Sequence, residues 1–102
     1  MEAAIVMTTV ASEDDAERLA SALVGDRLAA CVQQIRMESR YRYEDEVHVD
    51  PEILLLVKTA GDRVEQVQEY LRAEHPYDVP EILVVEAGGS AAYLEWLVEG
   101  TR

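Results

Sequence analysis

One short plan occurs twice in this chain, and this repetition limits the possible folds more than any other feature. The segments 6–15, "VMTTVASEDD", and 56–65, "LVKTAGDRVE", each run from an apolar stretch through a threonine and a turn to a polar residue. That polar residue is Ser12 in the first copy and Asp62 in the second, and a helical pattern follows both. Each copy therefore predicts a strand that leads directly into a helix.

Hydrophobic patterning predicts the first half of the secondary structure. β-branched apolar residues indicate a buried strand at 3–10. Apolar residues at helical spacing then predict a helix that Ser12 caps and Gly25 ends. The alternating segment 28–60 predicts two long strands joined near "YEDE", and its apolar part "ILLLVK" predicts a central strand of the sheet.

The second helix is predicted between a capping signal and a proline-rich connector. Asp62 precedes it as an N-cap, and Glu65 stands at the spacing of a capping box. Its predicted buried stripe consists of Val64, Val67 and Leu71. The connector 75–81, "HPYDVPE", holds two of the chain's three prolines. Because proline fixes its own backbone and moves the preceding residue out of the α region, the helix must end near His75 and the connector must be stiff.

The remaining segments complete the expected fold. Residues 81–87, "EILVVEA", predict another buried strand, and Ser90 after a glycine turn caps a last helix, "AAYLEWLVEG". This order predicts the α+β class, as a ferredoxin-like βαββαβ sandwich with an additional C-terminal helix. Two helices then lie on one face of an antiparallel sheet. Because the strands carry apolar residues on both sides, we expect further copies of the chain to cover the other face.

Length, charge and cysteine content exclude several classes of protein. The 102 residues suit a single domain spanning 1–102. A net charge of -12 argues against nucleic-acid binding through phosphates. No apolar run approaches the about 20 residues of a membrane span, and no basic region precedes the first apolar run, so we expect a cytoplasmic protein without membrane association. Cys31 is the only cysteine, which excludes an intramolecular disulfide.

The chain uses the charged residue types unevenly. Lys58 is the only lysine, and acidic residues outnumber basic ones by 21 to 9. Acid-rich, lysine-poor chains fit a high-salt cytoplasm, where salt screens the repulsion between carboxylates. We therefore hypothesise a halophilic source, and we expect the acidic surface to attract divalent cations loosely.

Five segments in their order along the chain resemble the divalent-cation tolerance (CutA) family. They are "LAACVQQ", "SRYRYEDEV", "EILLLVKT", "HPYDVPEIL" and "YLEWL". The resemblance spans nearly the whole chain, and its most specific part is the combination of the strand "EILLLVKT" with the connector. It implies a ferredoxin-like fold assembled as a tight homotrimer, with three sheets around a common axis, similar in architecture to the PII-type nitrogen signalling proteins. It also implies a link to copper and other divalent ions.

The hairpin departs from the family's usual pattern. The family usually has Tyr-x-Trp followed by an acid and a glycine, whereas this chain has Tyr41, Arg42, Tyr43, Glu44 and Asp45. Tyrosine in place of tryptophan keeps an aromatic plate with a polar edge. The missing glycine leaves the geometry of the hairpin turn open.

Two residues are the candidate metal ligands. His75 carries an imidazole on a stiff connector, and neutral imidazole binds copper and zinc well. The alternative is that His75 caps the end of the second helix. Cys31 offers a soft ligand for copper(I), and the alternative is a buried, inert thiol. His48 and Asp50 share one face of a strand, but in this acidic chain a solvated hairpin face is the better explanation for them.

A second group of residues is expected to line a cleft between subunits. Lys58 ends an apolar strand, where its charge needs a partner, either an anionic ligand or a carboxylate such as Glu81. The resemblance implies that the hairpin aromatics converge with Lys58, His75 and Glu81 in the trimer. These cleft candidates are Tyr41, Tyr43, Lys58, Tyr77 and Glu81.

Two functional hypotheses follow from these residues. The first is a cytoplasmic protein of divalent metal ion tolerance that needs no cofactor but binds copper or another divalent cation. The second is a PII-like trimeric signalling or interaction module that binds a small anion or a protein partner at clefts between subunits. No glycine-rich phosphate loop supports a nucleotide ligand. No arrangement of Ser12, Cys31 and His75 resembles a catalytic triad, so we do not expect an enzyme.

Overall fold

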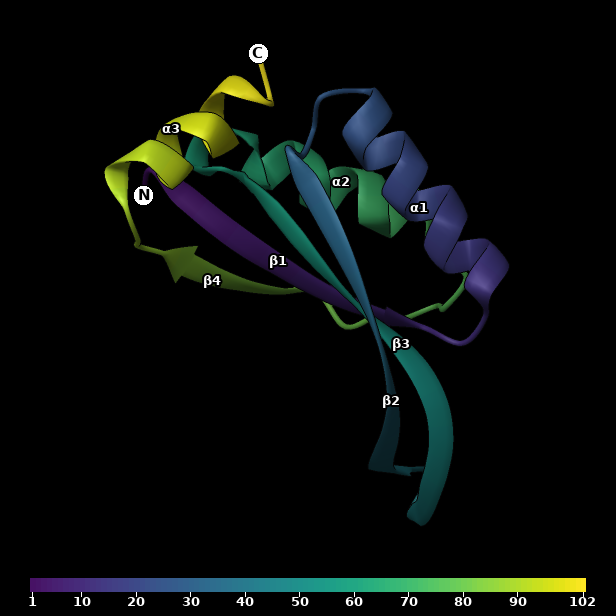
Figure 1. Cartoon of the computed structure of the whole chain (residues 1–102). Helices are drawn as coiled ribbons and strands as arrows, with labels where there is room; N and C mark the ends of the chain where they lie inside the picture. The colour runs from purple at the N-terminus through teal and green to yellow at the C-terminus, as the bar shows by residue number, and fades with distance from the viewer.

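The computed structural model describes residues 1–102, and its elements follow the expected order. An antiparallel sheet and three helices make up the α+β fold, as predicted (Figure 1). The elements are β1 (Ala3–Val10), α1 (Glu13–Gly25), β2 (Cys31–Tyr43), β3 (Glu46–Ala60), the short 3-10 helix η1 (Gly61–Arg63), α2 (Val64–Glu74), β4 (Leu83–Ala87) and α3 (Ala91–Glu99). No helix is both long and apolar enough to cross a lipid bilayer.

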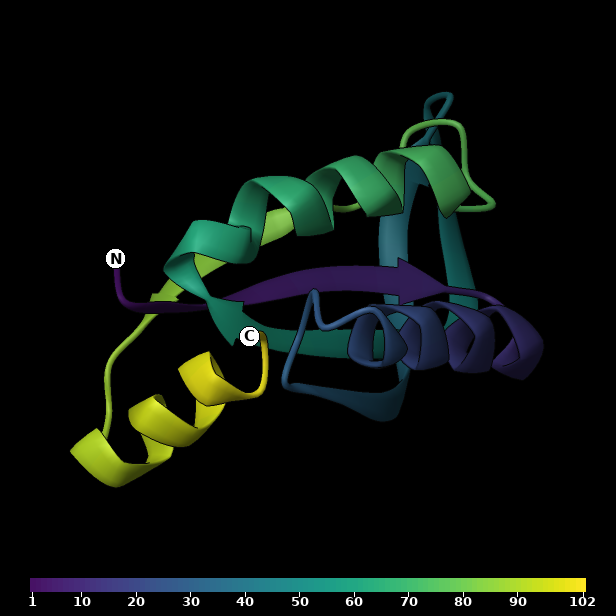
Figure 2. The same cartoon turned by 90° about the horizontal axis from the view of Figure 1, so that it is seen from above.

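The four strands form one sheet in the order β2-β3-β1-β4. All three neighbouring pairs are antiparallel, which is the ferredoxin-like arrangement that the repeated plan predicts. Helices α1 and α2 lie over the same side of the sheet (Figure 1), and seen from above they run on either side of β1 (Figure 2). The central position predicted for "ILLLVK" is confirmed, because β3 pairs with both β1 and β2.

The core lies between the helices and one face of the sheet. Alternate residues of the two central strands, such as Val6, Leu55 and Val57, are fully buried there. They belong to one cluster with residues of α1 and α2, including Leu23 and Leu71. The predicted stripe of α2 is confirmed, since Val67 and Leu71 are buried and Val64 packs against the cluster. One contiguous core thus joins both halves of the repeated plan.

The opposite face of the sheet, called the open face below, is also apolar. Its residues alternate with the core residues along the same strands, and the strand register places them side by side: Ile5, Met7, Ile35, Leu54, Leu56, Leu83 and Val85. None of them is buried, and Ile35, Leu83 and Val85 are 46%, 53% and 44% exposed. The chain therefore leaves one large apolar face of its sheet accessible.

The β2–β3 hairpin projects beyond the rest of the sheet (Figure 1). The last pair between β1 and β3 joins Val10 to Ile53, so beyond that point the two hairpin strands pair only with each other. The turn lies at "YEDE", as predicted. Glu44 and Asp45 both adopt left-handed backbone conformations, with φ values of 51° and 63°. Left-handed backbone at both central residues is the pattern of a tight hairpin turn, here built without glycine.

The two copies of the repeated plan begin their helices differently. Ser12 caps α1 as predicted, because its hydroxyl accepts a hydrogen bond from the Asp15 N–H at 3.1 Å. The prediction that Asp62 caps α2 is wrong. A 3-10 turn, η1, precedes α2, and the N-cap position falls on Arg63 without a side-chain cap. The Asp62 carboxylate is engaged elsewhere, since both its oxygens pair with Arg102 at 2.8 Å.

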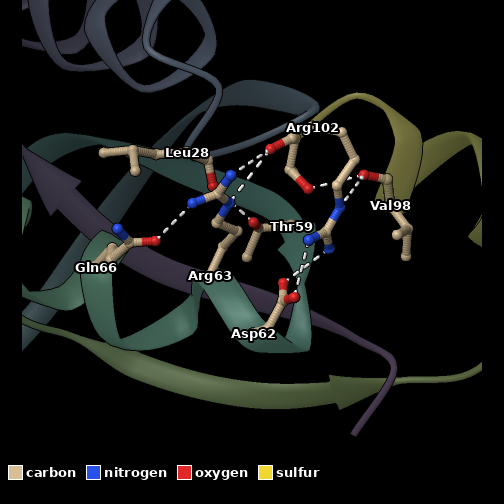
Figure 3. Close-up of polar contacts among 8 residues, drawn as sticks. Leu28, Thr59, Asp62, Arg63, Gln66, Val98 and Arg102 are labelled. Carbon is tan, nitrogen blue, oxygen red and sulfur yellow. Dashed lines mark hydrogen bonds and ion pairs between the residues drawn. The ribbon is translucent and has the colours of Figure 1, made fainter.

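A polar network ties the end of the chain to the start of α2 (Figure 3). The Arg63 guanidinium donates to the Thr101 carbonyl at 2.7 and 3.2 Å and to Gln66 at 2.9 Å. The Thr59 hydroxyl donates to the Leu28 carbonyl at 2.6 Å and so fixes the loop before β2. Gly61 is required here, because a Cβ atom at this position would lie 1.9 Å from the carbonyl oxygen of Met1. These contacts fix the chain around the start of α2, which has no side-chain cap.

Candidate functional site

A cleft lies between the projecting hairpin and the connector. Its volume is about 850 Å³. The hairpin provides Tyr41, Tyr43, Asp50 and Glu52 among its lining residues, and the connector provides Tyr77, Asp78, Val79 and Glu81. The structure thus brings together four of the five predicted cleft residues within a single chain, namely Tyr41, Tyr43, Tyr77 and Glu81.

The connector begins at the end of α2, as predicted. The helix ends at Glu74, and the backbone of His75 is extended, with φ −71° and ψ 139°, which Pro76 after it requires. The backbone N–H of His75 closes the helix by donating to the Leu71 carbonyl at 2.9 Å. The connector then passes the end of β1 before β4 starts at Leu83, two residues after the predicted start at Glu81.

The His75 ring fastens the connector to the end of β1. Its Nδ1 accepts a hydrogen bond from the Tyr77 N–H at 3.1 Å, and its Nε2 lies 2.9 Å from the Thr9 carbonyl oxygen. Since Nδ1 accepts, Nε2 must carry the proton and donate to Thr9. The ring is 9% exposed, and burial lowers the pKa of His75, although the bond to the Thr9 carbonyl opposes this shift. His75 is therefore held as a neutral ring.

The geometry of His75 bears on its predicted role as a metal ligand. A metal ion needs a free lone pair on a ring nitrogen. In His75 the only such lone pair, on Nδ1, already accepts from Tyr77. His75 does occupy the C-cap position of α2, but its ring bonds to Thr9 of β1 and not to the helix carbonyls that the alternative interpretation assigned to a cationic side chain. The structure therefore gives His75 a positioning role for Tyr77 and the cleft wall.

Two tyrosine hydroxyls of the cleft donate to carboxylates of β3. Tyr77 donates to Glu52 at 3.1 Å, and burial together with this bond raises the pKa of Tyr77 to about 12. Tyr41 donates to Asp50, and this bond raises the pKa of Tyr41. His48 does not join the pair with Asp50 but stacks on Tyr41, with ring centroids 5.4 Å apart. Both tyrosines thus remain protonated at neutral pH and keep the carboxylates in place.

The cleft has a strongly negative balance of charge. Four carboxylates line it, from Asp50, Glu52, Asp78 and Glu81, against the single cation of Arg40. All ion pairs of the structure lie elsewhere and involve Arg18, Arg36 and Arg102. Such a cleft attracts cations and repels anions.

Lys58 lies apart from the cleft, so its expected convergence with the other candidates does not occur within one chain. Its Nζ lies 3.5 Å from the Tyr93 hydroxyl and 5.6 Å from the centre of that ring. The alternative of an ion pair between Lys58 and a carboxylate such as Glu81 is not found within the chain, where Glu81 lines the cleft and forms no ion pair. Lys58 instead snorkels over an aromatic ring of α3.

Cys31 is next to Lys58 rather than next to His75. The register pairs Cys31 with Lys58 on the open face, whereas His75 contacts Thr9, which is aligned with Leu54. The thiol is free and partly exposed, so it is not the fully buried, inert thiol of the alternative interpretation. No three His, Cys, Asp or Glu side chains lie close enough to hold a metal ion within the chain. The two predicted metal ligands therefore do not form a common site in one chain.

Three carboxylates of the cleft, from Asp50, Glu52 and Asp78, were not predicted as cleft residues. A signal for two of them was present in the sequence. Alternation along the strand places Asp50 and Glu52 on the same face, and Asp50 faces Ser39 in the register, two positions from Tyr41. Their approach to Tyr77 depends on the path of the connector, which the sequence does not specify.

Comparison with protein families identifies one match over almost the entire chain. Residues 4–100 match the family described as "CutA1 divalent ion tolerance protein". A relative from Thermus thermophilus, named "Divalent-cation tolerance protein CutA", is 46% identical over 99 residues, which cover 95% of this chain and 96% of the relative. "Protein CutA, chloroplastic" from Arabidopsis thaliana is 41% identical over 100 residues, and the match covers 96% of this chain but 55% of the plant protein.

Solved structures agree with these matches. CutA from Xylella fastidiosa superimposes with a TM-score of 0.95 at 33% identity, and the match covers 100% of both chains. The divalent cation tolerance protein of Thermus thermophilus superimposes with a TM-score of 0.91 at 45% identity, and covers 98% of this chain and 99% of its own. On the sequence and structural matches together, this chain belongs to the CutA1 divalent ion tolerance protein family.

Proposed function

We propose that this chain is a homotrimeric protein of divalent-cation tolerance, which binds divalent cations, copper among them, in the cytoplasm. The observation that carries the proposal is the family match over residues 4–100. The descriptions of the family and of its relatives name tolerance proteins and no enzymatic reaction, so we propose a role without catalysis. No cofactor is needed for this role.

The open face supports assembly. Seven apolar side chains lie on it, among them Leu54, Leu56 and Val85, and no helix of the chain buries them. Apolar faces of this size are normally covered by another chain. A closed trimer buries the face of every copy, whereas an open chain of copies leaves one face uncovered at its end.

The cation site requires residues from more than one copy in this proposal. One chain offers no group of three suitable ligands, and the lone pair of His75 is already used. Cys31 is partly exposed on the open face, where a neighbouring copy would supply further ligands. We therefore assign the metal contact to Cys31 together with carboxylates, and not to His75.

The alternative is a trimeric interaction module that resembles the PII-type proteins. An anionic ligand does not suit the cleft of this chain, because four carboxylates line it and Lys58 lies elsewhere. A protein partner agrees better with this geometry. The fully projecting hairpin and the exposed side chain of Val79 would then be the contact surface.

The cytoplasmic location rests on the unpaired cysteine, which suits a reducing compartment. Relatives differ in this respect. The Arabidopsis protein is named chloroplastic, and a solved structure from Archaeoglobus fulgidus is described as a periplasmic divalent cation tolerance protein.

Equilibrium dialysis against copper(II) with excess magnesium tests the proposal. Redox-inert zinc(II) is measured in parallel, and magnesium occupies the loosely attracting acidic surface. We expect saturable binding that Cys31→Ser weakens about tenfold or more and that His75→Gln leaves within about twofold. If magnesium abolishes copper binding, or if Cys31→Ser leaves it unchanged, the proposed metal site is wrong. Either result would favour the interaction module.

A further inference from the structure

Few hydrogen bonds fasten the connector to the rest of the chain. Outside the helices and strands, no backbone–backbone hydrogen bond involves residues 76–82, and the pairing of β4 with β1 starts only at Leu83. Two hydrogen bonds hold the connector beyond His75, and both come from Tyr77. Its N–H donates to Nδ1 of His75, and its hydroxyl donates to Glu52. The attachment of this segment therefore depends on the state of one imidazole ring.

We propose that His75 is a pH switch for the connector. The neutral ring holds the connector against β1 and the hairpin, and protonation of the ring releases the residues after His75 while the sheet stays folded. This inference goes beyond divalent-cation tolerance, because it requires neither a metal ion nor a second copy of the chain. The ring is already buried by elements of its own chain, so the switch does not depend on a free surface.

The two ring nitrogens respond to protonation in opposite ways. Nδ1 accepts from the Tyr77 N–H at 3.1 Å, so a proton on Nδ1 would set two donors against each other. Nε2 donates to the Thr9 carbonyl at 2.9 Å, and a positive charge on the ring strengthens this bond. Protonation therefore leaves the ring and the end of α2 attached to β1, and it detaches only the chain that follows.

Charged groups of several elements act on the ring. Asp15 of α1 and Glu52 of β3 favour the protonated form, whereas Arg18 of α1 disfavours it. Arg18 is itself paired with Asp15 and with Glu74 at the end of α2. The neighbouring Tyr77 ring, with its centroid 4.9 Å away, stays uncharged because its pKa is raised to about 12. These influences partly cancel, so burial of the ring has the largest effect.

Burial sets the direction in which the switch responds to pH. It lowers the pKa of His75 below the ordinary value of about 6.5. The attached state is therefore complete above that ordinary value and is lost as the pH falls through the lower folded value. Carboxyl groups in general take up protons only around pH 4, so the ring can respond before general acid unfolding begins.

Release of the connector also frees the base of the hairpin. The Tyr77 hydroxyl reaches Glu52 at 3.1 Å only while the Tyr77 backbone is held by His75. Val79, further along the connector, is 91% exposed and contributes little packing. A segment with few hydrogen bonds and little buried surface opens at a lower free energy than the whole chain unfolds. The expected movement is therefore local.

An NMR titration of the histidine rings combined with amide hydrogen exchange tests the proposal. The chain has two histidines, and ring nitrogen shifts distinguish the protonated from the unprotonated nitrogen. We expect His75 to carry its proton on Nε2 at neutral pH. As His75 takes up a second proton, the protection factor of the Tyr77 amide should fall about fivefold with the same midpoint. The amides of β1 and β3 should keep their protection.

Two variants separate this ring from other titrating groups. In His75→Gln the Tyr77 amide should show no change in protection factor over the same pH range, because the side chain cannot titrate. His48→Gln is the matched control, since it removes the other imidazole, which stacks on Tyr41 in the hairpin. It should leave the change in protection and its midpoint as in the wild type. The wild-type titration alone remains decisive if His75→Gln folds poorly.

Three results would overturn the proposal. The first is protonation of His75 without a change in the protection of the Tyr77 amide. The second is a simultaneous loss of protection in β1 and β3, which would mean unfolding of the sheet. The third is a step in Tyr77 protection that persists in His75→Gln. None of them bears on copper binding through Cys31, which is measured separately.

Discussion

The two faces of the sheet carry similar apolar residues but differ in how far the chain itself buries them. Leu55 and Leu56 are neighbours on β3, yet Leu55 is fully buried under the helices and Leu56 is only half-buried on the open face. The difference arises because α1 and α2 both cross over to the same side of the sheet. One face is thus completed by local chain connections, and the other is left for the further copies of the proposed trimer. The proposal therefore predicts that folding and assembly are separable.

The largest expected effect is the difference in the free energy of unfolding between variants of these two leucines. Leu55→Ala should lower the free energy of unfolding by about 3 kcal/mol, because it leaves a cavity in the core cluster. Leu56→Ala should change the unfolding of a dissociated chain by less than about 1 kcal/mol but should weaken the association of copies. Denaturant unfolding at several protein concentrations measures both quantities. Equal losses of chain stability in the two variants would remove the distinction between the faces.

A second effect concerns the end of β1, where the ring of His75 fastens the connector. His75→Gln should lower the free energy of unfolding by about 2 kcal/mol, since one or both of its buried hydrogen bonds are lost. Assembly through the open face should survive at neutral pH. Chemical denaturation together with a mass measurement checks this, and dissociation without destabilisation would instead place His75 in the interface.

The pH dependence of stability follows from the same ring. Burial lowers the pKa of His75 below its ordinary value of about 6.5, so the unfolded chain binds a proton more readily than the folded one. The stabilisation is complete above the unfolded value and is lost as the pH falls through the lower folded value. Denaturation between pH 7.5 and 5 should show this decline in the wild type and a weaker decline in His75→Gln. An equal slope in both proteins would contradict the assignment.

A smaller effect tests the two copies of the repeated plan. Ser12→Ala should destabilise the chain by about 1 kcal/mol, because it removes the N-cap of α1. Asp62→Ala should have a smaller effect that high salt diminishes further, since the carboxylate only pairs with Arg102 at the surface. Thermal unfolding of both variants at low and high salt distinguishes a cap from an ion pair.

The smallest expected effect is the contribution of each single surface carboxylate to the melting temperature. With a net charge of -12, the folded chain repels itself, and potassium chloride should raise its melting temperature by screening. The same salt should also strengthen the association of copies through their apolar open faces. A melting temperature that does not change between low and molar salt would argue against a halophilic source.

The order of elements, the antiparallel sheet and the core stripe of α2 were predictable because they depend on local periodicity. Ser12 and Ser90 also cap their helices as predicted. Asp62 does not, because its role depends on Arg102, which is far away in the sequence. A local capping pattern cannot reveal such a competing partner.

The candidate site was predictable only in part. The connector and hairpin aromatics meet within one chain, whereas the resemblance implied that they converge between subunits. The position of Lys58 was not predictable from its strand, since it depends on the path of α3 and Tyr93. The use of both His75 nitrogens likewise depends on a contact with Thr9, which is 66 residues away along the chain.

The mass of the protein in solution tests the proposed assembly most directly, with Leu56→Glu as the matched variant. We expect a particle of three chains for the wild type, each of 11.4 kDa, and folded single chains for Leu56→Glu, because a buried charge would be uncompensated in the assembled open face. A wild-type protein of single, stably folded chains, or a Leu56→Glu variant that still assembles as three, would contradict it.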